Sequence, residues 1–164
     1  MTIRSITNYK GGDQKIDCIG CAIEQGKINK NDTIFTTDFF GAHQDYEIPI
    51  PGFIIVCTRR HIQSIDEFNE GEKADFTNTL IKVRKALRHV LKIDKVYFHQ
   101  EEDTSHHFHV WVFPRYDWMA EKFGTKIESV RPIMEYARAN LKTPENLQKV
   151  DKALQKLKQY YRRN

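Results

Sequence analysis

The sequence has no long apolar segment and few cysteines. Its longest apolar run, FIIVC at positions 53–57, is far too short to cross a bilayer, and its first residues, MTIRSITNYK, lack the apolar core of a signal peptide. Three cysteines, an odd number, do not form a disulfide framework. We therefore expect no membrane partner, no disulfide-stabilised secreted domain, and a cytoplasmic protein.

A large excess of charge of either sign is also absent. The 164 residues include 26 Lys and Arg and 22 Asp and Glu, a net charge of +4, and the basic excess lies largely in the last part of the chain. This distribution does not imply a nucleic-acid partner. Hydrophobic residues at 40% and charged residues at 29% are typical of a globular protein with one hydrophobic core.

The apolar pattern predicts an α+β fold with an antiparallel sheet. Strands are expected at positions 33–37, 53–58, 95–100 and 107–113, and a long helix at 69–92. The helix is indicated by apolar residues at alternating spacings of four and three, which form one buried stripe: Phe76, Leu80, Val83, Leu87 and Val90. Strands followed by a helix and then a hairpin favour an antiparallel arrangement.

The last forty residues predict a pair of helices appended to this domain. Apolar residues mark a first helix at Val130, Ile133, Ala137 and Leu141, and a second at Leu147, Val150, Leu154, Leu157 and Tyr161. Thr143 followed by Pro144 is typical of a helix start. We therefore divide the chain into a domain at 1–124 and a C-terminal helical extension at 125–164.

The stretch SHHFHVWVFPR, positions 105–115, carries three of the seven histidines. Its alternation is typical of a strand, so His107, His109 and Trp111 should share one face. His106 lies one residue before this set and should face the other side. Imidazole is a nucleophile, a proton carrier and a metal ligand near neutral pH, so this face is a candidate site.

The run HFHVWVFPR resembles the active-site strand of the histidine triad superfamily. Two further stretches are similar to that family: CIGCAIEQGKI (18–28) resembles its Cys-x-x-Cys opening, and FIIVCTRRHIQSIDEF (53–68) its central strand. The match extends over roughly residues 18 to 115. The resemblance implies a homodimeric nucleotidyl hydrolase or transferase that attacks the α-phosphate of purine nucleotides, either nucleoside phosphoramidates or dinucleoside polyphosphates.

The resemblance also implies catalytic roles for three histidines. His109 matches the nucleophile, which would form a nucleotidyl-histidine intermediate that water can hydrolyse. His107 matches the first triad histidine, which supports the nucleophile or binds metal. His61 matches a histidine near the triad at the end of the central strand.

Four other residues are expected to bind the substrate. Asp45 matches an acidic residue that bonds the ribose hydroxyls, and Thr104 a hydroxyl that contacts phosphate. We also place Gln100 and Trp111 among the substrate-binding residues. Alternatively, Asp45 and Thr104 are ordinary loop and turn residues.

Trp111 occupies the family's third triad position and is the main departure from its pattern. The indole keeps an N–H donor but cannot accept a hydrogen bond or carry charge. Two alternatives therefore stand beside the enzyme. The first is a nucleotide-binding module with little or no turnover, and the second is a zinc-stabilised interaction domain whose histidines are metal ligands.

Cys18 and Cys21 have the spacing of a zinc-binding turn, although they are equally typical of reduced cysteines. The family's third ligand falls on Phe53, so a site made of Cys18, Cys21 and His107 would need His43 or a water. We therefore expect no metal to be required for the chemistry, and a structural zinc at less than one equivalent per chain.

Overall fold

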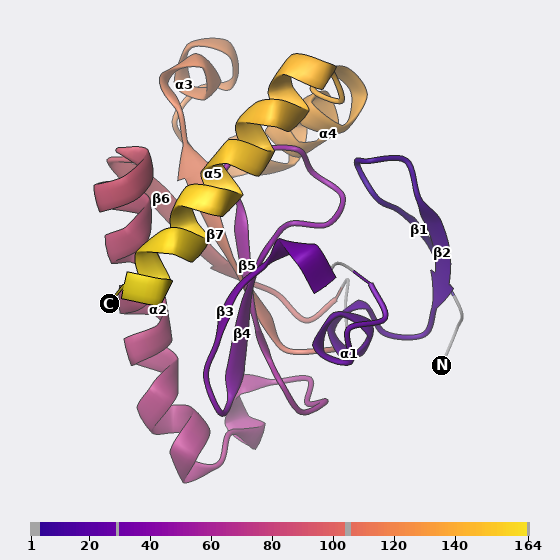
Figure 1. Ribbon diagram of the computed structural model, residues 1–164, viewed down its shortest axis with the longest axis vertical. Coiled ribbons are helices and arrows are strands. Elements are labelled where there is room, and N and C mark those ends of the chain that lie inside the picture. The colour runs from indigo at the N-terminus through magenta and orange to yellow at the C-terminus, as the bar shows by residue number, and fades with distance from the viewer. Residues whose placement is uncertain (1–3, 29, 104–105, 164) are drawn as a thin grey trace.

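A computed structural model describes residues 4–28, 30–103 and 106–163. Its centre is a five-stranded antiparallel sheet in the order β3-β4-β5-β7-β6, beside which a two-stranded hairpin, β1-β2, stands apart (Figure 1). The strands are β1 (Arg4–Thr7), β2 (Asp13–Ile16), β3 (Thr33–Thr36), β4 (Phe40–Gln44), β5 (Ile54–Thr58), β6 (Lys95–Gln100) and β7 (His109–Arg115). The expected α+β class with an antiparallel sheet is confirmed.

Strand β7 alternates as the sequence predicts. Val110 and Val112 pack in one buried cluster, while Trp111 and Phe113 pack in another on the opposite face. The strand begins at His109 and not at His107. The Phe108 N–H bonds the Ile62 carbonyl at 2.7 Å, although the Phe108 carbonyl still accepts from the Thr58 N–H of β5 at 3.3 Å. His107 therefore lies just before the first residue pair of β7, at the end of the sheet.

Helix α2 (Glu70–Leu91) covers the face formed by Val110 and Val112. Its start is fixed by a reciprocal cap: Asn69 accepts from the Glu72 N–H at 2.9 Å, and the Glu72 carboxylate accepts from the Asn69 N–H at 2.8 Å. It ends at Lys92, which adopts the left-handed conformation with φ 57°. The expected helix at 69–92 is thus confirmed to within one residue at each end.

The opposite face of the sheet is covered by α3 (Asp117–Phe123) and α4 (Val130–Asn140). Met119, Ile133 and Ala137 are fully buried there against Phe53 and Phe113. The sequence did not indicate α3, β4, the β1-β2 hairpin or the short helix α1 (Ile19–Glu24), because each is too short to show a clear period.

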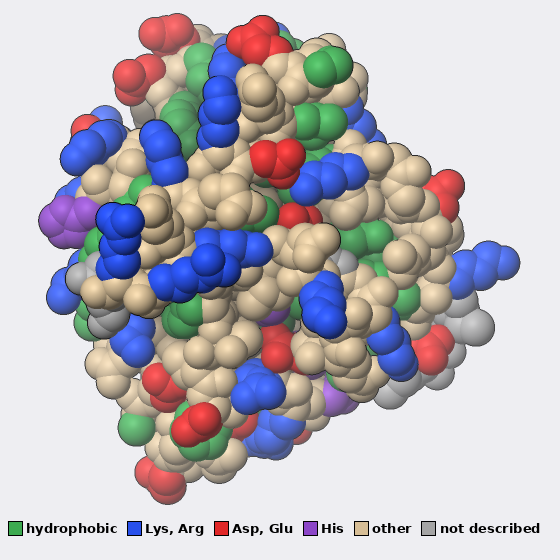
Figure 2. All heavy atoms as spheres, in the orientation of Figure 1, with side chains coloured by type: hydrophobic (Ala, Val, Ile, Leu, Met, Phe, Trp, Pro, Cys, Tyr) green, Lys and Arg blue, Asp and Glu red, His purple; other side chains and the backbone are tan. Residues whose placement is uncertain are grey.

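Helix α5 (Pro144–Arg163) crosses the molecule beside α2 and β3 (Figure 1). Leu154 and Leu157 are buried in the same cluster as Val83 and Leu87 of α2, so the helical extension shares a core with the sheet. Its outer side carries the expected basic residues, and Lys and Arg side chains gather on the face that it crosses (Figure 2). Among the described residues, no helix combines the length and apolar character needed to cross a membrane.

Because Leu157 is fully buried in the shared core, Leu157→Ala should lower the free energy of unfolding by about 2–5 kcal/mol. Urea denaturation followed by circular dichroism would measure this loss. Gln155→Ala, an exposed position of the same helix, is the matched control and should change stability little. Equal stability of the two variants would show that α5 is only loosely attached.

Candidate functional site

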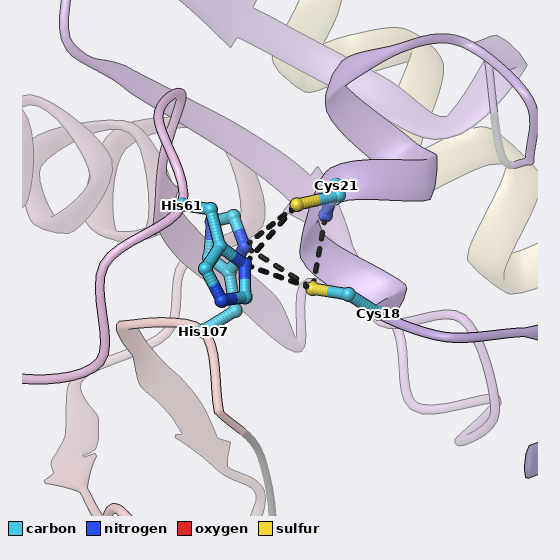
Figure 3. Close-up of side chains that lie close together, drawn as sticks. All are labelled: Cys18, Cys21, His61 and His107. Atoms are coloured by element: carbon cyan, nitrogen blue, oxygen red, sulfur yellow. Dashed lines mark hydrogen bonds between the residues drawn. The ribbon is translucent and has the colours of Figure 1, made fainter. Parts of the chain in front are cut away.

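Two cysteines and two histidines from distant segments converge at one end of the sheet (Figure 3). Cys18 caps the start of α1, and its sulfur accepts from the Cys21 N–H at 3.4 Å, which turns both thiols to the same side. His61 follows β5 and His107 precedes β7. We call Cys18, Cys21, His61 and His107 the Cys/His cluster.

The spacing within the Cys/His cluster fits a tetrahedral zinc ion. The Nδ1 atom of His61 lies 3.6 Å from the Cys18 sulfur and 3.2 Å from that of Cys21, and the Nδ1 atom of His107 lies 3.3 and 3.5 Å from the same sulfurs. Zn–S bonds of about 2.3 Å and Zn–N bonds of about 2.0 Å at tetrahedral angles place sulfur and nitrogen about 3.5 Å apart. If one thiol only formed a hydrogen bond to one histidine, that sulfur–nitrogen distance would be clearly shorter than the other three. The four sulfur–nitrogen distances are instead nearly equal.

The neighbouring backbone fixes the His107 tautomer that a metal requires. Its Nε2 atom lies 2.7 Å from the Thr58 carbonyl, which can only accept, so Nε2 carries the proton. The Nδ1 lone pair therefore points at the two sulfurs. This is the arrangement by which protein metal sites orient a histidine ligand.

The cluster also favours a thiolate. Burial disfavours the charged form of Cys18, but the hydrogen bonds with His107 and the Cys21 N–H outweigh burial and lower the pKa of Cys18 to about 6. Burial and the neighbouring Cys18 raise the pKa of Cys21 to about 11. Without metal, a Cys18 thiolate is stabilised when His107 Nδ1 also carries a proton, and although burial opposes the change, Cys18 raises the pKa of His107 in turn. Zinc would replace that proton, since the thiolate and the neutral imidazole are the forms that bind it.

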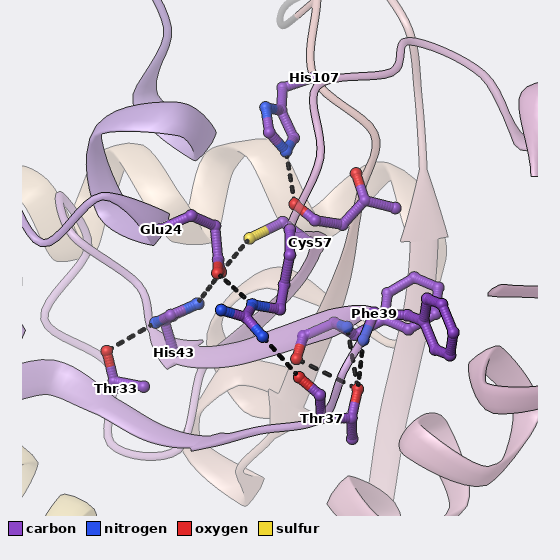
Figure 4. Close-up of polar contacts among 10 residues, drawn as sticks. Glu24, Thr33, Thr37, Phe39, His43, Cys57 and His107 are labelled. Carbon is purple, nitrogen blue, oxygen red and sulfur yellow. Dashed lines mark hydrogen bonds and ion pairs between the residues drawn. The ribbon is translucent and has the colours of Figure 1, made fainter. Parts of the chain in front are cut away.

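A second polar group lies beneath this cluster and anchors α1 to the sheet (Figure 4). The Glu24 carboxylate at the end of α1 accepts from His43 at 2.9 Å and from the Cys57 thiol at 3.6 Å, and His43 also lies 3.0 Å from the Thr33 hydroxyl. A side chain at Gly41 would overlap with Glu24 and His43, so only glycine permits this close approach.

His109 lies on the same face of the sheet as Trp111, next to the Cys/His cluster. Its Nδ1–H donates to the His107 carbonyl at 3.0 Å, which leaves Nε2 as the nitrogen with a lone pair. Burial lowers the pKa of His109, so the neutral, nucleophilic imidazole predominates at neutral pH. The side chain is 12% exposed and therefore reachable.

His109 lines a pocket of about 130 Å³ together with Asp45, Ile48, Trp111 and Met134. Asp45 accepts from the N–H groups of Glu47 and Ile48 at 2.9 and 2.6 Å. Burial outweighs these two bonds and raises the pKa of Asp45 to about 7. Asp45 therefore lies in the same pocket as His109, as expected, and also organises the loop after β4.

Comparison with solved structures identifies the architecture. A zinc-bound histidine triad family protein from Mycobacterium smegmatis superimposes with a TM-score of 0.63 at 17% identity, over 90% of this chain and 98% of that one. Members of the same family from Bacillus subtilis and Bacillus anthracis give TM-scores of 0.58 and 0.57, at 20% and 23% identity, over 86% and 85% of this chain and 96% and 95% of theirs. The chain has the histidine triad fold. No family sequence model and no curated protein matches it.

Within the histidine triad fold, the expected zinc ligands need correction. Phe53 is fully buried against Phe113 at 5.0 Å between ring centroids, and His43 bonds Glu24, so neither completes the Cys/His cluster. His61 completes it. From the sequence, His43 or a water was the expected replacement for the missing ligand, whereas the chain after β5 bends back toward α1 and brings His61 to Cys21.

This placement also changes the expected catalytic roles of two histidines. His107 has both ring nitrogens engaged, one with Thr58 and one with the cysteines. His61 directs Nδ1 toward the same sulfurs. Both therefore belong to the Cys/His cluster, and His109 is the triad-strand histidine that faces the pocket.

Of the other residues expected to bind substrate, Gln100 lies away from the pocket. Gln100 pairs with Val110, whose side chain is on the α2 face, so Gln100 lies on the opposite face from His109 and is not a pocket residue. Thr104 lies outside the described residues. His106 is exposed, in agreement with its expected separation from the pocket.

Trp111 is part of the pocket wall and part of the second core. It is 8% exposed and lies 6.1 Å from Phe53, 5.1 Å from His99 and 6.2 Å from His109 between ring centroids. The Arg131 guanidinium of α4 stacks over its indole at 5.1 Å. The C-terminal extension thus brings a positive charge beside Trp111.

Sequence reasoning missed His99, Glu101 and Arg131. The alternation of β6 could have indicated the first two, because His99 pairs with Trp111 and Glu101 follows two residues later. Nothing in the sequence could have placed Arg131, since its contact depends on how α4 packs on the sheet.

The four-residue cluster revises the expectation of less than one equivalent of zinc. We expect the purified protein to hold about one zinc per chain, because the Cys/His cluster supplies four ligand atoms within 4.8 Å of one another. Elemental analysis should show that Cys21→Ser and His61→Ala remove most of the metal. Cys57→Ser is the matched control, since this thiol lies outside the cluster, and should keep it. Full zinc content in both cluster variants would disprove this ligand set.

Proposed function

We propose that this protein is a nucleotidyl hydrolase or transferase whose nucleophile is His109. The observation that carries the proposal is the state of its ring: Nδ1–H is bonded to the His107 carbonyl, so Nε2 keeps its lone pair, and the partly exposed side chain lines the pocket. An imidazole held in this tautomer can attack an electrophilic phosphorus without first losing a proton.

The reaction would proceed in two steps at an α-phosphate. Nε2 of His109 attacks the phosphorus and expels the leaving group, and water or another acceptor then removes the nucleotidyl group. The proposed substrates are those that the family resemblance implies, purine nucleoside phosphoramidates and dinucleoside polyphosphates. Asp45 would bind the ribose hydroxyls, Trp111 would form one wall, and Arg131 would contribute positive charge for the phosphate.

Zinc would have a structural role in this enzyme. Cys18, Cys21, His61 and His107 would hold it, and it would fix the chain just before β7 so that the His107 carbonyl meets the His109 ring. No chemistry at phosphorus requires the metal. One protein of similar fold is described as zinc-bound, which supports a zinc site here. All three cysteines are free thiols, as is usual for proteins of the cytoplasm.

A nucleotide-binding module without turnover is the second candidate. It is favoured by Trp111, which places an uncharged indole where the family resemblance puts a third histidine. Turnover of any nucleotide ester by the purified chain distinguishes the enzyme from this alternative.

His109→Ala should reduce hydrolysis of adenosine or guanosine phosphoramidate by on the order of 10⁴-fold, because it removes the nucleophile. It should also abolish the nucleotidyl group that mass spectrometry detects on the wild-type chain when turnover is slow. Nucleotide affinity should change little, since ribose and base contacts lie elsewhere. His106→Ala is the control. A comparable loss in that variant would contradict the assignment, and binding without turnover in the wild type would favour the module.

We also propose a homodimer formed through α2 and β6. Strand β6 is the edge of the described five-stranded sheet, and Phe98 on it and Ile81 on α2 are 47% and 46% exposed. A free sheet edge beside exposed apolar side chains is a suitable surface for a second copy.

Phe98→Asp should convert the dimer to a monomer, because it places a charge at the proposed contact. Sedimentation velocity at micromolar protein would measure the change. Ile127→Asp is the matched control, as this residue is 50% exposed on another part of the surface. A wild-type monomer at these concentrations would refute the dimer.

A further inference from the structure

Glu101 lies beside the proposed nucleophile His109, and the two-step reaction at the α-phosphate assigns it no role. Its Oε1 atom is 3.7 Å from Nε2 of His109, and the side chain is 11% exposed. The second oxygen, Oε2, accepts from the Asp103 N–H at 3.0 Å, and this bond orients the carboxyl group. Glu101 directly follows β6, on the side of the sheet where His99 pairs with Trp111.

Glu101 borders the space in which a leaving group would lie. The attacking and leaving atoms lie in line on opposite sides of the phosphorus. The leaving atom is therefore two stretched bonds from Nε2, and the Glu101 carboxyl group, at 3.7 Å from Nε2, lies in that direction without reaching hydrogen-bonding distance of Nε2. A bound substrate would displace the carboxyl group to the side of its leaving atom, within hydrogen-bonding distance of it.

Three other side chains near His109 do not supply a proton to that atom, and Asp45 is assigned to the ribose hydroxyls. The Trp111 indole can donate a hydrogen bond but cannot transfer its proton at neutral pH. His107 uses one nitrogen on Thr58 and the other on the cysteines. An arginine side chain does not give up a proton in proteins, so Arg131 acts only as a fixed charge.

We infer that Glu101 is the general acid and base of the proposed reaction, an inference that rests on the proposed function of His109. In the first step, Nε2 of His109 forms a bond to the phosphorus while the phosphorus–leaving-group bond breaks. The leaving atom takes the electron pair of that bond and the proton of the Glu101 carboxyl group. The products are the nucleotidyl-imidazole and a Glu101 carboxylate.

The second step reverses the direction of the proton. A water molecule attacks the phosphorus from the side that the leaving group has vacated, and the Glu101 carboxylate takes one of its protons. The phosphorus–Nε2 bond breaks, and its electron pair returns to His109 as the neutral imidazole. Glu101 then carries the proton that the next first step requires.

This role can be separated from a structural one by changing the leaving group. Adenosine phosphoramidate expels an amine that must be protonated, whereas the 4-nitrophenyl ester of AMP expels a stable anion that needs no proton. Glu101→Gln keeps the size and hydrogen-bonding capacity of the side chain. Glu102→Gln is the matched control, because it removes the adjacent, exposed carboxylate.

In the full-length protein, Glu101→Gln should slow phosphoramidate hydrolysis by roughly 10²- to 10⁴-fold. With the nitrophenyl ester, the same variant should still release a rapid burst of about one nitrophenolate per site and then stall with the nucleotidyl group on His109, because water lacks its base. Glu102→Gln should behave as the wild type. Equal losses with both substrates and no burst, or unchanged phosphoramidate turnover, would overturn the inference.

The wild-type chain provides a second measurement that does not depend on the folding of a variant. Across a series of AMP aryl esters, the rate of the first step should change little as the leaving phenolate becomes more basic, since Glu101 protonates it. A steep fall in rate would refute the acid role while leaving His109 as the nucleophile. Absence of any nucleotidyl transfer in the wild type would refute the proposed function, and this inference with it.

Discussion

The His107 ring joins three segments that are far apart in the sequence. Its Nε2–H donates to the carbonyl at the end of β5, and its Nδ1 faces the two cysteines of the α1 turn. Its backbone carbonyl then receives the Nδ1–H of His109. The orientation of the pocket histidine is therefore set by one residue whose side chain is held by both the sheet and the Cys/His cluster.

The two polar groups at this end of the molecule differ in the chemistry that their spacing permits. In the Cys/His cluster, four sulfur–nitrogen distances of 3.2–3.6 Å surround one point, as metal ligands do. Around Glu24, by contrast, the 2.9 Å contact with His43 is a direct hydrogen bond. A buried carboxylate that is bonded in this way fixes α1 to β4 and keeps the cysteine turn in place. The second group thus supports the first.

The C-terminal extension participates in both cores and in the pocket. Leu154 and Leu157 of α5 pack with α2, and Met134 and Arg131 of α4 reach Trp111 and the pocket. An indole at this strand position is buried by α4 and covered by a guanidinium. The same helices that enlarge the core therefore also alter the charge beside the proposed nucleophile.

The sequence by itself determined the α+β class, the alternation of β7, the bounds of α2 and the place of His109 on the same face as Trp111, because strands and long helices leave periods of two and 3.6 in the residue pattern. It also indicated Asp45, which the structure brings to the same pocket. Only the tertiary structure decided which residue is the fourth member of the Cys/His cluster and that Gln100 lies outside the pocket. It also decided that Glu101 lies near His109 and Arg131 near Trp111. These depend on how loops bend after strands end and on how helices pack across a sheet, and such contacts between distant segments have no local period. His61 was visible in the sequence as a strand-end histidine, but only the return of its loop to α1 shows that it meets Cys21.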